Sequence, residues 1–251
     1  MEGIEHRRVN VNGINMHIAE KGEGPLILFI HGFPDLWYSW RHQIAALASL
    51  GYRCVAPDLR GYGDTDLPAT PTAYTSLHVV GDLTELLDVV AGDEEKVFVV
   101  GHDWGAMTAW SLSLYRSERI KALVNLSVVF TPRNPKRKPL DTLRAVYGND
   151  HYICRFQEPG EIESEFAQIG TAIVLKEFLK YRNPGPLYLP KGKAFAQPTD
   201  SPIANWELTA PWTGAQVKVP VKFIVGDLDL TYNAPGTKDY IHKEMYRFWR
   251  K

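Results

Sequence analysis

The stretch Val97-Phe-Val-Val-Gly-His-Asp-Trp-Gly-Ala-Met-Thr-Ala-Trp110 decides the fold of this chain. Its first four residues are apolar and mostly β-branched, which is typical of a short buried strand. Gly101-His-Asp-Trp-Gly105 then predicts an abrupt turn, and residues 106–115 predict an apolar helix. A strand, a Gly-x-nucleophile-x-Gly turn and a helix form a nucleophile elbow, in which a side chain at either glycine would collide with the neighbouring strand or helix. We therefore predict that Asp103, at the apex, is a nucleophile.

The same turn has a structural alternative, in which Asp103 only caps the helix that follows it. A second motif favours the catalytic interpretation. Leu26-Ile-Leu-Phe-Ile30 predicts a strand inside a parallel sheet, and His31-Gly-Phe-Pro34 follows directly. A loop of this kind gives one backbone N–H to an oxyanion hole, and the residue after the nucleophile gives the other. This assigns the two donors to Phe33 and Trp104.

Strand and helix patterns alternate over the first half of the chain. Asn12-Gly13 separates two alternating runs, residues 5–11 and 14–19, and predicts a hairpin of two antiparallel edge strands. Further strands are predicted at residues 52–57, 121–127 and 219–225, and helices at residues 37–49, 76–90 and 236–251. This alternation predicts an α/β fold with a mostly parallel sheet flanked by helices.

A polar loop, Asp58-Leu-Arg-Gly-Tyr-Gly-Asp-Thr-Asp66, follows the strand predicted at residues 52–57. It lacks the lysine and the spacing of a phosphate-binding loop. We predict instead that Asp58 and Arg60 form an internal ion pair that orders this loop.

After Val128 the pattern changes. Residues 131–139 are rich in proline and positive charge, and helices are predicted at residues 143–147, 152–156 and 161–180. A helical insertion after the sixth strand is typical of a lid that covers a nucleophile. We therefore predict three parts: residues 1–130 form the first part of the core, 131–204 a partial helical lid, and 205–251 the last part of the core.

Composition and charge narrow the class of protein. The 251 residues carry a formal net charge of -1, which gives no reason to expect nucleic acid as a partner. The sequence has no apolar run long enough to cross a membrane and no secretory signal, so we expect a cytoplasmic protein. Cys54 and Cys154 do not form a disulfide framework. Neither zinc-ligand spacing nor a dinucleotide fingerprint occurs, and no metal or organic cofactor is expected.

Several stretches carry a family resemblance. They are His31-Gly-Phe-Pro-Asp-Leu-Trp-Tyr-Ser-Trp-Arg-His-Gln43, Pro57-Asp-Leu-Arg-Gly-Tyr-Gly-Asp-Thr-Asp66, Gly101-His-Asp-Trp-Gly-Ala106, Arg133-Asn-Pro-Lys-Arg-Lys-Pro139, Tyr152-Ile-Cys-Arg-Phe-Gln157 and Asn205-Trp-Glu-Leu-Thr-Ala-Pro-Trp212. Through them the chain resembles the plant-type soluble epoxide hydrolases of the α/β-hydrolase superfamily. The resemblance runs from the first residues to about Ile241.

The resemblance implies a role for individual residues. In that family an aspartate attacks the epoxide carbon, two lid tyrosines donate protons to the ring oxygen, and a histidine paired with a second acid activates water. By motif, Asp103 matches the nucleophile, Tyr152 the first lid tyrosine and Asp229 the acid that orients the histidine. The aromatic residues Trp37 and Trp104 indicate a small apolar epoxide as substrate.

The sequence departs from the family in two places. Between Pro202 and Asn205 it lacks the part of the lid that carries the second tyrosine, and nothing after Asp229 matches the family's histidine. His242 corresponds to an ordinary helix position. These departures imply a shortened form whose ester hydrolysis is impaired. They also imply that the strand at residues 219–225 is an exposed sheet edge, which favours homodimers or aggregation.

Two other functions stay open on sequence grounds. One is a non-catalytic ligand-binding or regulatory protein built on the same fold, which the missing histidine favours. The other is a haloalkane dehalogenase, which also places a tryptophan after its aspartate but needs halide donors and no lid tyrosine. The combination of Asp103 and Tyr152 favours an epoxide hydrolase.

Overall fold

The computed structural model of the chain describes residues 2–92, 95–136, 138–180, 187–192, 217, 219–225, 237–241 and 243. The chain divides into two compact units. The first comprises Met1–Phe130, Gln216–Gly226 and Asp239–Lys251, and the second Thr131–Ala215 and Asp227–Lys238. Asp229, His242 and residues 205–212, which the sequence singles out, lie outside the described residues.

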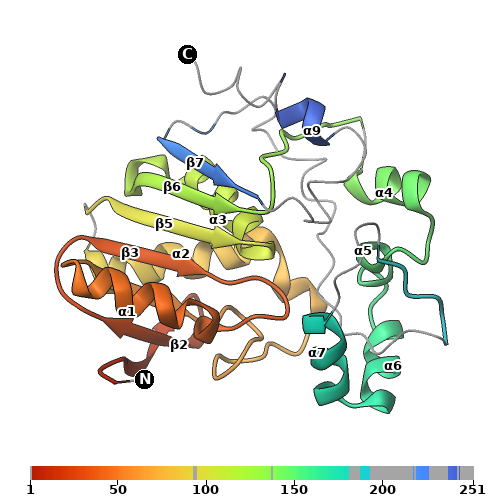
Figure 1. The fold of residues 1–251 in the computed structure, drawn as a ribbon, viewed down its shortest axis with the longest axis horizontal. Coiled ribbons are helices and arrows are strands. Elements are labelled where there is room, and N and C mark those ends of the chain that lie inside the picture. Colours follow the sequence, from red (N-terminus) through yellow and green to blue (C-terminus); the bar gives the residue numbers. More distant parts are fainter. Residues whose placement is uncertain are drawn as a thin grey trace. The chain divides into compact units, whose positions relative to one another are not determined.

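The first unit contains a seven-stranded sheet with the order β1-β2-β4-β3-β5-β6-β7 among the described residues (Figure 1). The strands are β1 (Glu5–Val11), β2 (Ile14–Lys21), β3 (Leu26–Ile30), β4 (Arg53–Pro57), β5 (Val97–His102), β6 (Ile120–Leu126) and β7 (Val221–Ile224). The pairs β3–β4, β3–β5, β5–β6 and β6–β7 are parallel, and the pairs β1–β2 and β2–β4 are antiparallel. The predicted mostly parallel α/β sheet is therefore confirmed.

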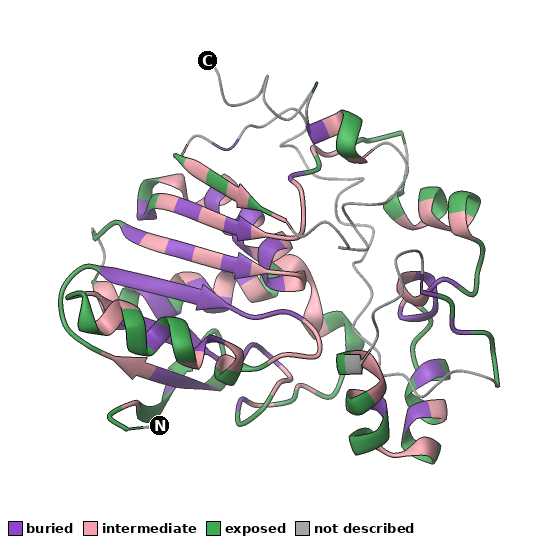
Figure 2. Ribbon diagram, in the orientation of Figure 1, coloured by how far each residue is buried: buried purple, intermediate pink, exposed green. Residues whose placement is uncertain are grey.

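Helices flank this sheet. They are α1 (Arg41–Ser49), α2 (Ser76–Ala91) and α3 (Trp104–Tyr115), with short 3-10 helices at Trp37–Trp40, Pro71–Tyr74 and Ser117–Arg119. The short helix α9 (Thr237–Tyr240) is divided between the two units. In Figure 1, α1 lies in front of the sheet and α2 behind it. All five residues of β3 are buried, as expected for a parallel strand that is covered on both faces (Figure 2).

The N-terminal hairpin forms where Asn12-Gly13 predicts it. Both turn residues have positive φ, 46° for Asn12 and 77° for Gly13, as the favoured two-residue hairpin turn requires. The expectation that both strands lie at the edge was wrong for β2. Its C-terminal half pairs with β4, from Ile18 opposite Pro57 to Lys21 opposite Cys54, so only β1 lies at this edge of the sheet.

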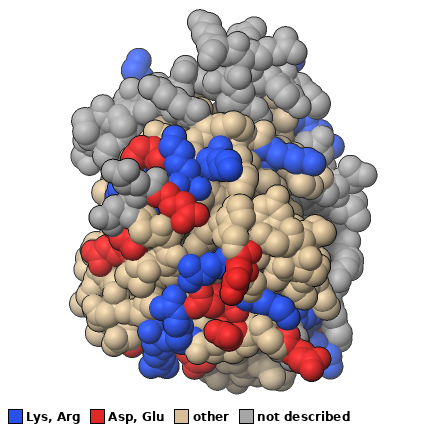
Figure 3. Space-filling view, turned by 90° about the vertical axis from the view of Figure 1, so that its left-hand side faces the viewer, with Lys and Arg blue, Asp and Glu red and all other residues tan. Residues whose placement is uncertain are grey.

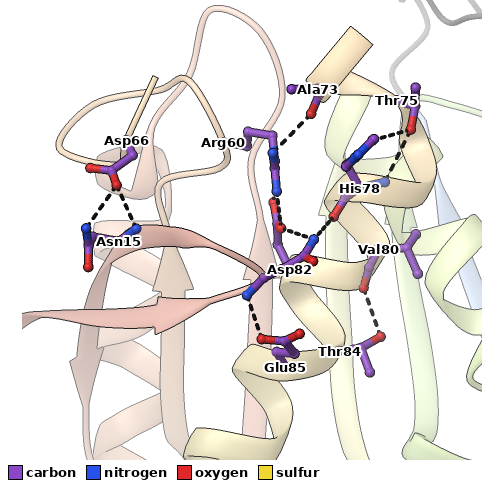
Figure 4. Close-up of polar contacts among 11 residues, drawn as sticks. Asn15, Arg60, Asp66, Ala73, Thr75, His78, Val80, Asp82, Thr84 and Glu85 are labelled. Atoms are coloured by element: carbon purple, nitrogen blue, oxygen red, sulfur yellow. Dashed lines mark hydrogen bonds and ion pairs between the residues drawn. The ribbon is translucent and has the colours of Figure 1, made fainter. Parts of the chain in front are cut away.

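The predicted ion pair between Asp58 and Arg60 was also wrong. Arg60 donates from Nε and Nη2 to the Asp82 carboxylate of α2, at 2.8 and 2.6 Å (Figure 4). Asp58 Oδ2 instead lies 2.8 Å from His17 Nδ1. The Asn12 amide also donates to Asp82, at 2.7 Å. Burial raises the pKa of Asp82 more than these hydrogen bonds lower it. Asp58 and Arg60 thus each pair with a residue on another element of the fold. The local sequence of the loop does not predict these partners.

The second unit is helical after β6, as the sequence predicts. It contains α4 (Pro139–Tyr147), α5 (Tyr152–Arg155), α6 (Glu161–Ile169) and α7 (Thr171–Lys180). The single helix predicted at residues 161–180 is in fact two helices, because Gly170 adopts a φ of 93° and ends α6.

Charges of both signs lie on the surface. Lys and Arg side chains lie interspersed with Asp and Glu on the face drawn in Figure 3, so no field of a single sign covers that face. Among the described helices, none is long and apolar enough to cross a membrane.

Candidate active site at the Asp103 elbow

The turn between β5 and α3 is as tight as the sequence predicts. Asp103 has φ 54° and ψ -125°, a conformation that residues other than glycine rarely adopt and that is often found at functional sites. A Cβ on Gly101 would lie 2.7 Å from the Gly105 carbonyl oxygen, and one on Gly105 would overlap the carbonyl oxygens of Ile30 and His31. Steric exclusion therefore explains both glycines.

The Asp103 side chain does not cap α3, although Asp103 is the residue before the helix. Its Oδ1 instead accepts a hydrogen bond from the Phe33 N–H at 2.9 Å, and the Trp104 N–H also donates to the carboxylate. Burial raises the pKa of Asp103, and these two hydrogen bonds only partly offset the effect. The structure thus brings together the carboxylate and the two amides that the sequence assigned to one site.

The loop after β3 reaches the elbow because of Gly32 and His31. A Cβ on Gly32 would lie 2.5 Å from both Cβ and Oδ1 of Asp103, so only glycine permits this approach. His31 is fully buried; its Nε2 accepts the Leu59 N–H at 2.9 Å and its Nδ1 lies 2.8 Å from the Gly32 carbonyl oxygen. These partners require a neutral ring with the proton on Nδ1, and burial lowers the pKa of His31 accordingly. His31 therefore holds the loop that presents the Phe33 N–H.

An acid–imidazole pair beside the elbow was missed by the sequence analysis. Asp35 Oδ2 lies 3.4 Å from His102 Nδ1, and the two side chains are 26% and 40% exposed. Burial alone would raise the pKa of Asp35, but its hydrogen bonds with His102 and Ser39 lower it. The signal was present, because Asp35 and His102 follow or end the neighbouring parallel strands β3 and β5, whose carboxyl ends meet.

Trp37 and Tyr152 belong to different units. The Trp37 N–H donates to Asp58 Oδ1 at 3.0 Å, and its half-buried ring contacts His6 and His17, with centroid distances of 4.7 and 6.4 Å. Its substrate-binding role stays a prediction. Tyr152 is the first residue of α5 in the second unit, and its N–H donates to the Leu187 carbonyl at 3.0 Å.

No group of three or more His, Cys, Asp or Glu side chains in the described part of the chain is arranged to hold a metal ion. Cys54 and Cys154 are both free and buried.

Comparisons with known proteins agree with this geometry. A family model described as alpha/beta hydrolase fold matches residues 25–151. Epoxide hydrolase 1 of Siraitia grosvenorii is 52% identical over 273 residues, which cover 96% of this chain and 86% of that protein. Epoxide hydrolase 3 of the same plant is 53% identical over 280 residues, covering 98% and 88%.

Solved structures give the same result. The structure of potato (Solanum tuberosum) epoxide hydrolase I is 56% identical, covers 95% of this chain and 86% of its own, and has a TM-score of 0.89. The crystal structure of a Vigna radiata epoxide hydrolase is 51% identical, covers 99% and 88%, and has a TM-score of 0.90.

The parallel sheet, the sharp elbow and the matching family model define the class, an α/β hydrolase. Within this class, the chain belongs to the epoxide hydrolase family, because plant members of that family align with nearly all of it at about half identity. The resemblance noted from the sequence motifs is thereby confirmed.

Proposed function

We propose that this protein hydrolyses an apolar epoxide to a vicinal diol through an ester formed on Asp103. The observation that carries the proposal is the hydrogen bond from the Phe33 N–H to Asp103 Oδ1 at the apex of the elbow. Relatives that align with nearly all of the chain are named epoxide hydrolases. This hydrogen bond supports a nucleophilic role for the Asp103 carboxylate rather than a role as a helix cap, because the side chain makes no capping hydrogen bond to α3.

Ring opening follows from the two oxygens of Asp103. Because the amide hydrogen bond holds Oδ1, we assign the attack on the epoxide carbon to Oδ2. An epoxide carbon carries no carbonyl, so the carboxylate displaces the ring oxygen directly and forms an ester. The ring oxygen leaves as an alkoxide, a poor leaving group, and Tyr152 is assigned the proton that neutralises it.

Ester hydrolysis uses the same two amides. When water attacks the ester carbonyl carbon, negative charge develops on Oδ1, and the Phe33 and Trp104 N–H groups stabilise it. Family motifs assign Asp229 as an acid that orients a base in this step. That assignment stays part of the proposal, because Asp229 lies outside the described residues.

We also propose that ester hydrolysis is the slow step. The alignments with the two Siraitia grosvenorii enzymes run over 273 and 280 residues, more than the 251 residues of this chain. They therefore contain gaps in this chain, and we assign one of these to the lid, between Pro202 and Asn205, where the family motifs are interrupted. The role of the second unit as that lid and a cytoplasmic location belong to the same proposal.

Association through β7 is a further part of the proposal. Among the described strands β7 is outermost, pairs with β6 and leaves Ile224 exposed. Such an edge can pair with a second copy of the chain. Light scattering at several concentrations tests this; a monomer mass at every concentration would reject it.

The test of the proposed function is the intact mass of the protein after mixing with styrene oxide, with diol measured alongside. We expect an adduct of one substrate mass that Asp103→Ala abolishes and that Asp64→Asn, a change of an exposed loop carboxylate, leaves intact. Only the ionised form of Asp103 attacks the epoxide. Because the pKa of Asp103 is raised, adduct formation should decline on acidification at a higher pH than it would with an aspartate of ordinary pKa. A folded protein that yields neither adduct nor diol would favour the ligand-binding alternative. Release of halide from a chloroalkane would favour the dehalogenase.

A further inference from the structure

The Phe33 N–H can stabilise negative charge on Asp103 Oδ1 only while it keeps its hydrogen-bond distance, which is 2.9 Å in the structure. The loop that presents this N–H, residues 31–36, follows β3 and belongs to no helix or strand. A ladder of backbone hydrogen bonds therefore does not fix the loop, and other contacts must hold the Phe33 N–H in place.

Two consecutive residues after β4 attach this loop at both of its ends. At the start of the loop, the Leu59 N–H donates to His31 Nε2 at 2.9 Å. Directly after the end of the loop, the Trp37 N–H donates to Asp58 Oδ1 at 3.0 Å. The segment between these attachments, which carries the N–H that reaches the elbow, is therefore tied down on each side.

Asp58 is itself fixed to the sheet. It is 1% exposed, its N–H donates to the His17 carbonyl oxygen of β2 at 3.0 Å, and its Oδ2 lies 2.8 Å from His17 Nδ1. Its carbonyl oxygen accepts the Thr65 hydroxyl at 2.6 Å, and Oδ2 also accepts the Asp64 N–H at 3.3 Å. A Cβ on Gly63 would lie 2.3 Å from Oδ2, so glycine is needed there to leave room for the carboxylate. Asp58 is thus a rigid point to which the loop is attached.

The attachment at Trp37 is a strong one. A carboxylate that accepts an N–H forms a charge-assisted hydrogen bond, roughly twice as strong as one between neutral groups. We propose that Asp58 is a positioning residue for ester hydrolysis, which holds the loop at Trp37 and thereby keeps the Phe33 N–H directed at Asp103 Oδ1. This inference rests on the proposed function and adds to it a residue that acts through the loop rather than on the reacting atoms.

A loosened loop should affect the two chemical steps differently. In ring opening the attack is assigned to Oδ2 of Asp103, and the ester can form without the Phe33 hydrogen bond to Oδ1. In ester hydrolysis the negative charge develops on Oδ1, and the same hydrogen bond stabilises the transition state. Without Asp58, adduct decay should therefore slow more than adduct formation.

The pH profile of adduct formation gives a second criterion. The Phe33 hydrogen bond lowers the pKa of Asp103, against the larger effect of burial. Weakening this bond should raise that pKa, so adduct formation would decline at a higher pH on acidification. Loss of the negative charge on Asp58 would by itself act in the opposite direction. His102 and Asp35, whose charges also act on Asp103, are common to all the variants, so the direction of the shift separates loop position from charge.

The experiment follows adduct formation and adduct decay separately, by intact mass after rapid mixing with styrene oxide and removal of excess substrate. The variants are Asp58→Ala and Asp58→Asn, and the matched control is Asp66→Ala. Asp66 lies in the same loop after β4, and its Oδ2 also binds β2, accepting from the N–H and side-chain amide of Asn15 at 2.9 and 3.0 Å. None of its contacts in the described part of the chain reaches the loop after β3.

We expect Asp58→Ala to slow adduct decay about tenfold, part of the effect of removing an oxyanion-hole donor outright, and to change formation at pH 8 by less than about threefold. Asp58→Asn keeps an oxygen acceptor for Trp37 but makes a weaker hydrogen bond, so decay should slow about threefold. Asp66→Ala should change neither rate. Because the decay constant is measured only on molecules that carry the adduct, a smaller folded fraction does not alter it.

Amide hydrogen exchange tests the attachment without substrate. In Asp58→Ala, and more weakly in Asp58→Asn, exchange at the Trp37 and Phe33 N–H groups should become faster while exchange in β3 and β5 stays unchanged. A general loss of stability would instead speed exchange throughout the sheet.

Each outcome supports or overturns the inference. Wild-type decay in both Asp58 variants, equal slowing in Asp66→Ala, or a midpoint that moves to lower pH in Asp58→Ala would overturn the positioning role and leave the proposed function standing. If Asp58→Ala does not fold, Asp58→Asn decides: slower decay with faster exchange at Trp37 supports the role, and wild-type values overturn it.

Two outcomes concern the wild type. If it forms diol without a detectable adduct, accumulation of adduct in Asp58→Ala supports the role, and its absence overturns it. Neither adduct nor diol from the folded wild type would overturn the proposed function and, with it, this role of Asp58.

Discussion

The Asp103 elbow and the segment that carries Tyr152 are held in place by different physical means. In the elbow the constraint lies in the backbone, because Gly105 allows α3 to approach the carbonyl oxygens of Ile30 and His31. In the Tyr152 segment (residues 148–169) backbone hydrogen bonds to Leu187 and Leu189 are supplemented by one buried side chain. Arg155 is 2% exposed and donates from Nη1 to the Leu189 carbonyl and from Nη2 to Glu165, at 2.6 Å for the latter.

Two buried histidines, one in each unit, differ in how fully their ring nitrogens are hydrogen-bonded. His31 in the first unit has a partner for each ring nitrogen, Leu59 N–H and the Gly32 carbonyl. His151 in the second unit is 5% exposed, yet its Nδ1 has no partner among the described atoms. A satisfied polar group fixes its surroundings, whereas an unsatisfied one costs stability. The elbow is therefore built for a fixed geometry, and the Tyr152 segment tolerates a less favourable one.

The largest effect is expected from Gly105→Ala. The added methyl group overlaps two backbone oxygens, so β3 and the elbow must separate, and we expect a loss of about 4 kcal/mol, above the usual range for overpacking. The matched control is Gly148→Ala in the second unit. No atom lies within 4 Å of its Cβ position, so its positive φ alone should cost about 1 kcal/mol. Urea unfolding measures both, and equal losses would show that the elbow is not limited by sterics.

Arg155→Met comes next, with an expected loss of about 3 kcal/mol, because it leaves the Glu165 carboxylate and the Leu189 carbonyl without their guanidinium. The double variant Arg155→Met with Glu165→Met should recover part of this loss, since it removes the uncompensated charge. If the double variant loses as much as the two single changes together, Arg155 acts through packing rather than through its charge.

The third prediction concerns pH. Burial lowers the pKa of His151 to about 4 from its ordinary 6.5. Between pH 6.5 and pH 4 the imidazole of His151 is protonated in the unfolded chain but neutral in the folded chain. Its contribution to the free energy of unfolding is therefore fully present above pH 6.5 and is lost as the pH falls toward 4. A shift of one pKa unit corresponds to about 1.4 kcal/mol, so we expect the His151 contribution to this loss to be about 3 kcal/mol.

The measurement is urea unfolding of the wild type and of His151→Phe at a series of pH values. Their difference isolates His151, because the other titrating groups are common to both proteins. At pH 7 the phenylalanine should cost little, since it replaces a ring with an unpartnered nitrogen. A difference that stays constant from pH 7 to pH 4 would contradict the burial argument.

Much of the first unit could be predicted from local pattern. Asn12-Gly13 predicts its hairpin because both residues adopt positive φ, and the glycines around Asp103 predict the elbow because a Cβ at either position would clash with the backbone. The partners of Asp58 and Arg60 could not be predicted, because each lies on another element and is chosen by tertiary packing. The break in the helix at residues 161–180 had a local signal, Gly170, that apolar periodicity concealed.

In the candidate site, too, some features follow from local sequence and others depend on tertiary packing. The sequence predicted that Phe33, Trp104 and Asp103 lie together, and they do, because a sharp turn leaves little freedom to the atoms around it; their catalytic roles stay a proposal. The pair of Asp35 and His102 depends on the register of β3 against β5, where Ile30 is opposite Gly101. A sequence reveals that two strands exist more readily than it reveals which residues face each other.

The smallest effect is expected from Glu158→Gln, which removes the ion pair with Arg144 in the second unit. The two side chains are 34% and 48% exposed, so water and salt screen the attraction, and we expect a loss below about 0.5 kcal/mol. Set beside Arg155→Met, this change tests whether burial, rather than the number of ion pairs, determines how firmly the Tyr152 segment is held. Urea unfolding at low and high salt measures it. A loss comparable to that of Arg155→Met would mean that the exposed charges hold the segment, and that its order should decline as salt is added.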